Sequence, residues 1–207
     1  MPAKPNIIFV LTDDLSWDLV PHMPRVKAMQ KAGLTFTDFF VADSLCCTSR
    51  ATILTGQFPH NTGVRTNFPP NGGYHVFKER GGEQASYGPA LRRTGYRTGF
   101  VGKYMNGYLP EETHGGPGPH VPPGWDAWYV GGNAYAHYNY TLNENGKLVT
   151  YGNRPRDYLT DVLADKSVRF VEQAAADSAP FFLQVSTYAP HGPFIPAPRH
   201  ANVRPNV

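Results

Sequence analysis

One stretch of the chain reads Cys46-Cys47-Thr48-Ser49-Arg50-Ala51-Thr52-Ile53-Leu54-Thr55-Gly56. Ser49 is a favourable helix N-cap residue and residues 50–54 tolerate a helix, so we expect a loop that enters a helix beside the cysteines. A helix N-terminus offers free backbone N–H groups and a positive dipole end, which bind anions and lower a thiol pKa. Arg50 adds a planar cation that matches tetrahedral oxyanions. The stretch therefore indicates either an anion site with a reactive cysteine or a buried structural cysteine pair.

Outside this stretch, three short apolar runs are each followed by charged or titratable side chains. The runs and these side chains are residues 6–11 with Asp13 and Asp14, residues 97–101 with Lys103, and residues 181–185 with His191. Continuous apolar runs of this length are typical of strands buried on both faces of a parallel sheet. Carboxyl ends of parallel strands share one edge, where open α/β sheets bind ligands. We therefore expect the polar side chains to converge there with Cys46.

The paired carboxylates of Asp13 and Asp14 are costly at a strand end unless a positive charge lies between them, so they are candidate metal ligands. A hard divalent cation bound by oxygen ligands would relieve their mutual repulsion. Plainer interpretations also exist for the strand ends: an exposed turn with two solvated aspartates, a solvated Lys103, and a rigid turn that carries His191 incidentally.

The rest of the chain predicts an α/β protein. Helical periodicity marks residues 24–32, 87–94 and 157–176, alternation marks a strand over residues 34–41, and Asn145-Gly146 predicts a type I′ hairpin. The fold class expected is a mostly parallel central sheet with helices on both faces.

Composition limits the possible partners. The net charge is +3 and no dense basic run is present, which argues against nucleic acid as a partner. No apolar run reaches membrane-spanning length, so we expect no membrane partner. Two adjacent cysteines cannot build a disulfide framework.

The pattern Cys-x-x-Ser-Arg followed by Leu-Thr-Gly resembles the signature of type I sulfatases. This resemblance implies that a formylglycine-generating enzyme oxidises Cys46 to formylglycine, whose hydrate is the nucleophile. The Asp-Asp pair, Gly102-Lys103-Tyr104 and the Pro-His-x-Pro around His191 are similar to further family motifs. They imply that Asp13, Asp14 and the modified Cys46 bind a calcium ion. They also imply catalytic roles for Arg50, Lys103 and His191, with His191 as general acid.

The substrate class follows from a narrower resemblance. Gly-Lys-Tyr-x-Asn, which ends at Asn106, and the segments 122–128 and 138–141 are similar to sulfatases that act on 6-sulfated N-acetylglucosamine units. A sulfated sugar or an aryl sulfate is the expected substrate. Asn106 would contact it, and Asn133 and His137 either line the substrate pocket or are ordinary loop residues.

The resemblance also sets expectations for the whole chain. It implies an alkaline-phosphatase-like sandwich in which residues 1–207 form the N-terminal catalytic domain, with the C-terminal segment and further metal ligands absent. The family favours an extracytoplasmic compartment, although Met1-Pro2-Ala3-Lys4 does not read as a signal peptide.

Two alternatives stay open. The same superfamily core serves phosphonate and phosphate diester hydrolases. Thr48 stands where the family usually has proline, a position that the maturation enzyme reads. A homologue that is not matured would bind sulfated glycans without catalysis.

Overall fold

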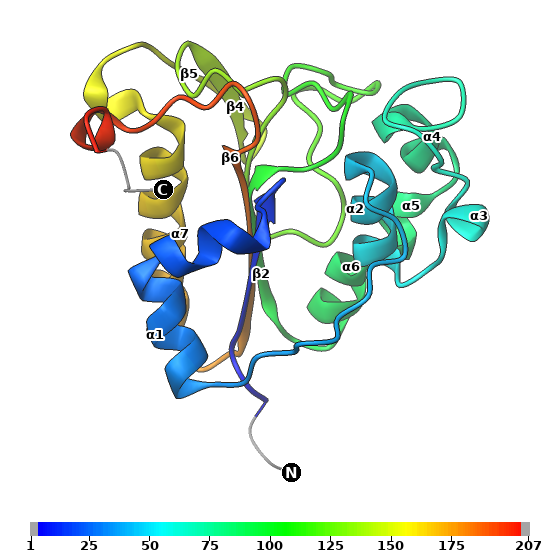
Figure 1. Ribbon diagram of the computed structural model, residues 1–207. Helices are drawn as coiled ribbons and strands as arrows, with labels where there is room; N and C mark the ends of the chain where they lie inside the picture. The colour runs from blue at the N-terminus through cyan, green and yellow to red at the C-terminus, as the bar shows by residue number, and fades with distance from the viewer. Residues whose placement is uncertain (1–3, 204–207) are drawn as a thin grey trace.

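The central element is a six-stranded sheet in a computed structural model that describes residues 4–203. Its order is β1-β6-β2-β3-β4-β5 (Figure 1). The strands are β1 (Ile7–Asp13), β2 (Arg97–Lys103), β3 (Ala127–Gly131), β4 (Tyr140–Glu144), β5 (Lys147–Tyr151) and β6 (Phe181–Pro190). β1, β6, β2 and β3 are parallel, while β4 and β5 add an antiparallel hairpin. The carboxyl ends of β1, β6 and β2 therefore lie next to one another at one edge.

Helices cover both faces of this sheet, as the sequence predicted (Figure 1). α7 packs on β6, β2 and β3 from one side, and α2 and α6 lie on the other. The α-helices are α1 (Pro24–Ala32), α2 (Cys46–Thr55), α3 (Pro59–Thr62), α4 (Gly73–Glu79), α5 (Gly82–Ala85), α6 (Tyr87–Arg93) and α7 (Leu159–Ala175). Short 3-10 helices are η1 (Trp17–His22), η2 (Pro155–Asp157) and η3 (Pro198–His200). No helix in the described part of the chain is both long and apolar enough to cross a membrane.

Two apolar clusters hold the layers together. One contains Phe100, Trp128 and side chains of α2, and the other contains Leu163, Phe170 and other side chains of α7 against the opposite face of the sheet. β2 is buried along almost its whole length, and it contributes Phe100 to the first cluster and Val101 to the second. The side chain of Lys103 at its end is therefore held in a fixed position.

Several local predictions are confirmed. The helix at residues 24–32 has the predicted bounds, and the helices at 87–93 and 159–175 agree with prediction to within one or two residues. The hairpin turns at Asn145 and Gly146, both with positive φ, as a type I′ turn requires. β2 and β6 are longer than expected, so Lys103 is the last residue of its strand and His191 follows directly on Pro190.

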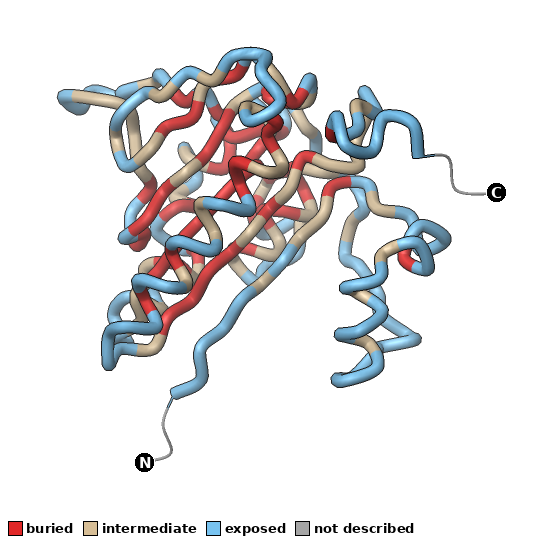
Figure 2. The backbone as a smooth tube through the Cα atoms, turned by 90° about the vertical axis from the view of Figure 1, so that its left-hand side faces the viewer, coloured by how far each residue is buried: buried red, intermediate tan, exposed pale blue. Residues whose placement is uncertain are grey.

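Three local predictions are wrong. Residues 34–41 form no strand, and their side chains are exposed. The run at residues 6–11 is a strand, but β1 lies at the edge of the described sheet and exposes Ile8 and Val10 (Figure 2). Ser49 does not cap the helix, because α2 already begins at Cys46.

Candidate active site

The three predicted strand ends meet at the carboxyl edge of the sheet. β1 pairs with β6 so that Asp13 lies opposite Pro190, which places Asp14 beside His191. β2 lies on the other side of β6 and brings in Lys103. Neighbouring positions in the sheet, rather than closeness in sequence, thus bring these side chains together.

Asp13 is buried between two cations. Its carboxylate contacts the ammonium of Lys103 at 2.5 Å and the guanidinium of Arg50 at 3.3 Å. The guanidinium of Arg50 also donates a hydrogen bond to the backbone carbonyl of Lys103 at 2.8 Å, which fixes the orientation of the guanidinium. All three side chains are almost fully buried. Since two cations face one carboxylate, the group favours binding of a further anion.

Asp14 turns away from the strand and faces His191. Its φ of 57° lies in the left-handed region, which aspartate tolerates better than most residues do and which is common at functional sites. One carboxylate oxygen lies 3.5 Å from Nε2 of His191. Nδ1 of His191 lies 2.7 Å from the carbonyl oxygen of Gly192, which can only accept a hydrogen bond. Nε2 is therefore the nitrogen that can gain or lose a proton beside Asp14.

The two cysteines have different environments at the start of α2. Cys47 is fully buried, and burial raises the pKa of its thiol to about 11, although backbone hydrogen bonds from Asn106 and Gly73 and the charge of Arg50 oppose this. Cys46 is the first residue of the helix and is only partly buried. Cys47 is therefore an inert core residue, and only Cys46 is placed for chemistry.

Cys46 and the two aspartates form a potential metal site. One ligand atom from each of Asp13, Asp14 and Cys46 lies within 4.8 Å of the others. A cavity of about 100 Å³ adjoins them, and Ser44, Ser49 and Arg50 also line it. The carboxylates suit a hard cation such as Ca²⁺, whereas a sulfur ligand does not. An oxygen in place of the Cys46 sulfur would match the two carboxylates, so the site fits calcium best after such a modification.

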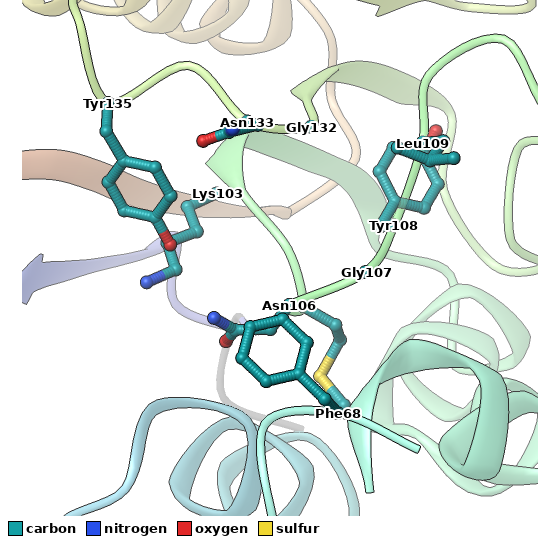
Figure 3. Close-up of a pocket in the computed structure, with 10 residues that line it drawn as sticks. Phe68, Lys103, Asn106, Gly107, Tyr108, Leu109, Gly132, Asn133 and Tyr135 are labelled. Carbon is teal, nitrogen blue, oxygen red and sulfur yellow. The ribbon is translucent and has the colours of Figure 1, made fainter. Parts of the chain in front are cut away.

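The predicted substrate residues fall into two places. Asn106 and Asn133 line a cavity of about 250 Å³ that also contains Lys103 (Figure 3). His137 does not line that cavity. It is buried, stacks on Tyr158, and lines a separate cavity together with His191. The substrate-binding roles of these three residues stay predictions.

Two residues that contact the candidate active site, Tyr135 and Asn67, were not predicted from the sequence. The ring of Tyr135 lies over Lys103 at 4.9 Å and has its centroid 4.5 Å from that of His191. The Asn67 side chain accepts a hydrogen bond from the backbone N–H of Cys47 at 2.9 Å, which satisfies an open donor of α2. Neither residue stands in a motif. Only the abundance of aromatic residues around Tyr135 could have suggested a role.

Comparison with known proteins identifies the family. A sulfatase family model matches residues 5–206. The N-acetylglucosamine-6-sulfatase of Capra hircus is 41% identical over 99% of this chain, and the chain covers 37% of that relative. The chain thus spans little more than a third of the length of this curated protein.

Solved structures agree with this result. A structure in complex with its substrate D-glucosamine-2-N,6-O-disulfate is similar with a TM-score of 0.68 and 26% identity, covering 95% of this chain and 37% of that one. The crystal structure of Ps i-CgsB with k-i-k-neocarrahexaose gives a TM-score of 0.74 at 28% identity, covering 92% and 46% of the respective chains. Because the family model spans nearly the whole sequence and the fold agrees, this chain belongs to the sulfatase family.

Proposed function

We propose that this chain carries the catalytic centre of a sulfatase that hydrolyses a sulfate ester of a sulfated amino sugar. The observation that supports this most strongly is the meeting of Asp13, Asp14 and Cys46 within 4.8 Å at the sheet edge. Two buried cations, Arg50 and Lys103, lie directly beside this group.

The charges suit a sulfate ester. The ester group is an anion, and negative charge grows on the bridging oxygen as the sulfur–oxygen bond breaks. Arg50 and Lys103 are held by buried hydrogen bonds, so they need little reorganisation to stabilise that charge. Their pairing with Asp13 keeps both side chains in place before substrate arrives.

Asp13 and Asp14 would hold a calcium ion, together with an oxygen at residue 46. When bound, the ion would polarise the sulfate oxygens and lower the pKa of a nearby hydroxyl. Calcium takes six to eight oxygen ligands, so the described residues would supply part of the coordination shell.

Cys46 is the proposed source of the nucleophile. A formylglycine-generating enzyme would convert its side chain to an aldehyde, and one hydroxyl of the hydrated aldehyde would lose its proton and attack the sulfur atom. The second hydroxyl of the sulfated hydrate would then lose its proton and expel sulfate, which restores the aldehyde. His191 would donate the Nε2 proton to the departing sugar oxygen, and Asp14 would stabilise the protonated imidazole. Arg50 would anchor the modified residue on the helix that carries both of them.

The proposed substrate is an amino sugar sulfated at the 6 position. The goat relative is named an N-acetylglucosamine-6-sulfatase, and one structural neighbour holds a glucosamine disulfate. Asn106 and Asn133 line a cavity next to Lys103, where the sugar part of such an ester would lie. An extracytoplasmic compartment, which the family favours, would expose the protein to glycans of this kind.

Sulfate release from N-acetylglucosamine 6-sulfate tests this proposal. Protein co-expressed with the formylglycine-generating enzyme should release sulfate, EDTA should suppress the release, and added calcium should restore it. A Cys46→Ala variant should lose activity, whereas Phe58→Ala, which changes an exposed side chain that lines neither of the two cavities at the site, should retain it. Activity in Cys46→Ala would overturn the proposal.

Faster turnover of an aryl phosphonate would favour the phosphonate hydrolase. Glycan binding without turnover would favour a non-catalytic homologue.

A further inference from the structure

The cavity beside Lys103 has two aromatic sides (Figure 3). Phe68 and Tyr135 lie at its opposite ends, and Lys103 and Asn106 lie between them. Its volume of about 250 Å³ corresponds to roughly eight water molecules. The cavity can therefore hold a ring-sized group of a ligand whose sulfate is at the neighbouring metal site.

The lining of the cavity matches a pyranose ring. Apolar and aromatic side chains predominate, and Asn106 and Asn133 add amides to the hydroxyl groups of the two lining tyrosines. Asn106 is half-buried and lines the cavity, while its Oδ1 is shielded from solvent and has no hydrogen-bond partner among the described residues. A sugar presents apolar C–H faces to aromatic rings and hydroxyl or amide donors at its rim, and a few placed polar groups then fix its orientation.

Phe68 is exposed although its loop is firmly anchored. Its side chain is 64% exposed, so the ring adds little to the core. The neighbouring Asn67 is hydrogen-bonded to the backbone of Cys47 at 2.9 Å, and Thr66 donates a hydrogen bond to the carbonyl of Phe68 at 2.6 Å. The backbone N–H of Gly73 closes the loop onto Thr66 at 3.0 Å. The backbone that carries this apolar ring is thus anchored next to the helix that starts at Cys46.

Tyr135 forms the other side and also contacts the catalytic groups. Its ring lies against both Lys103 and His191. Substitution of Tyr135 would therefore disturb the catalytic centre together with the cavity. Phe68 makes no aromatic-ring or ionic contact with Asp13, Lys103 or His191, so it allows a cleaner test.

We propose that Phe68 and Tyr135 are the two aromatic walls of a pyranose-binding cleft, and that Phe68 determines affinity for the sugar part of the substrate. This inference rests on the proposed function, because the sulfate must occupy the site at Asp13 and Cys46. It adds a specificity-determining residue to that site.

Binding to a Cys46→Ala background tests the inference without any need for turnover. N-acetylglucosamine 6-sulfate and inorganic sulfate are titrated calorimetrically in the presence of calcium. Phe68→Ala should weaken binding of the sugar sulfate roughly three- to tenfold, which is the range expected for loss of one aromatic contact. Binding of inorganic sulfate should not change, because it does not reach the cleft. Phe68→Trp should retain sugar affinity.

Phe58→Ala is the matched control. Phe58 has a similar exposure of 59%, against 64% for Phe68, but it does not line the cavity. Equal sugar affinity in Phe68→Ala and the Cys46→Ala parent would overturn the inference, as would an equal loss in Phe58→Ala. If the wild-type protein releases no sulfate, the proposed function fails, while this comparison of affinities still gives a result.

Discussion

At the scale of single residues, the two adjacent cysteines show how burial selects the reactive group. Cys46 begins α2 beside two aspartates, whereas Cys47 is buried in the apolar cluster that also contains Leu54 and Tyr74. The sequence alone could not separate them, because the thiol that faces the core depends on where the helix begins. Ser49 suggested a later start, but the helix begins at Cys46, and the backbone N–H of Cys47 donates a hydrogen bond to Asn67, which lies outside the helix.

Alkylation should distinguish these thiols in protein that has not been matured. At pH 8 about one in a thousand Cys47 side chains is ionised at a pKa of about 11, and the side chain is inaccessible. Iodoacetamide should therefore label Cys46 alone in the folded protein and both residues after denaturation. Peptide mass spectrometry measures the outcome, and preferential labelling of Cys47 would contradict this assignment.

His191 should matter most for substrates with poor leaving groups. A sugar alkoxide needs a proton as it departs, whereas 4-nitrophenolate does not. His191→Asn should therefore lower kcat on N-acetylglucosamine 6-sulfate by about 10²- to 10⁴-fold and affect 4-nitrophenyl sulfate far less. Steady-state kinetics on both substrates measure this difference. Equal losses on both would argue against proton donation by His191.

At the scale of elements, the buried parallel strands were the most predictable part of the molecule. Apolar runs located β2 and β6, and their order beside β1 placed Lys103 and His191 at one edge. The prediction of a strand over residues 34–41 was wrong, because an alternating segment forms a strand only when a neighbouring strand pairs with it. Among the described residues, no strand pairs with this segment. The position of Tyr135 depends on the path of the loop between β3 and β4, which sequence periodicity does not encode.

That same loop contains a buried histidine that should make the fold sensitive to acid. Burial lowers the pKa of His137 below its ordinary value of 6.5. As the pH falls below 6.5, the unfolded chain binds a proton here before the folded protein does, so stability decreases. Asparagine tolerates the positive φ at position 137. The His137→Asn variant should therefore show a smaller decrease in melting temperature between pH 7 and pH 5 than the wild-type protein. An identical decrease in both proteins would contradict a role for His137.

At the scale of the whole molecule, apolar surface is unevenly distributed. Most of the exposed large apolar side chains lie in the first 45 residues, including Trp17, Phe36, Phe39 and Phe40. α1 buries no residue, and β1 forms an edge of the described sheet (Figure 2). Apolar side chains gathered in one part of the sequence, rather than scattered singly, are unusual on a protein surface. The sequence prediction of a fully buried β1 was wrong because β1 has a neighbouring strand on one side only and α1 buries no residue among the described residues.

This surface should be measurable on the 207-residue chain by itself. We expect strong enhancement of 8-anilinonaphthalene-1-sulfonate fluorescence, and we expect Phe36→Asp combined with Phe40→Asp to reduce it. Phe194→Asp, which changes a similarly exposed ring elsewhere, serves as the control and should have a smaller effect. Fluorescence no higher than that of a well-packed monomer would contradict the expectation.

The most direct test of the central claim, that Cys46 supplies the nucleophile, is the mass of the tryptic peptide that contains it. Protein co-expressed with a formylglycine-generating enzyme should give a peptide about 18 Da lighter, because sulfur is exchanged for oxygen and two hydrogens are lost. Fragmentation should locate the change at Cys46 and leave Cys47 intact. A Thr48→Pro variant shows whether Thr48 limits conversion. An unmodified Cys46 in the wild-type protein would contradict the account.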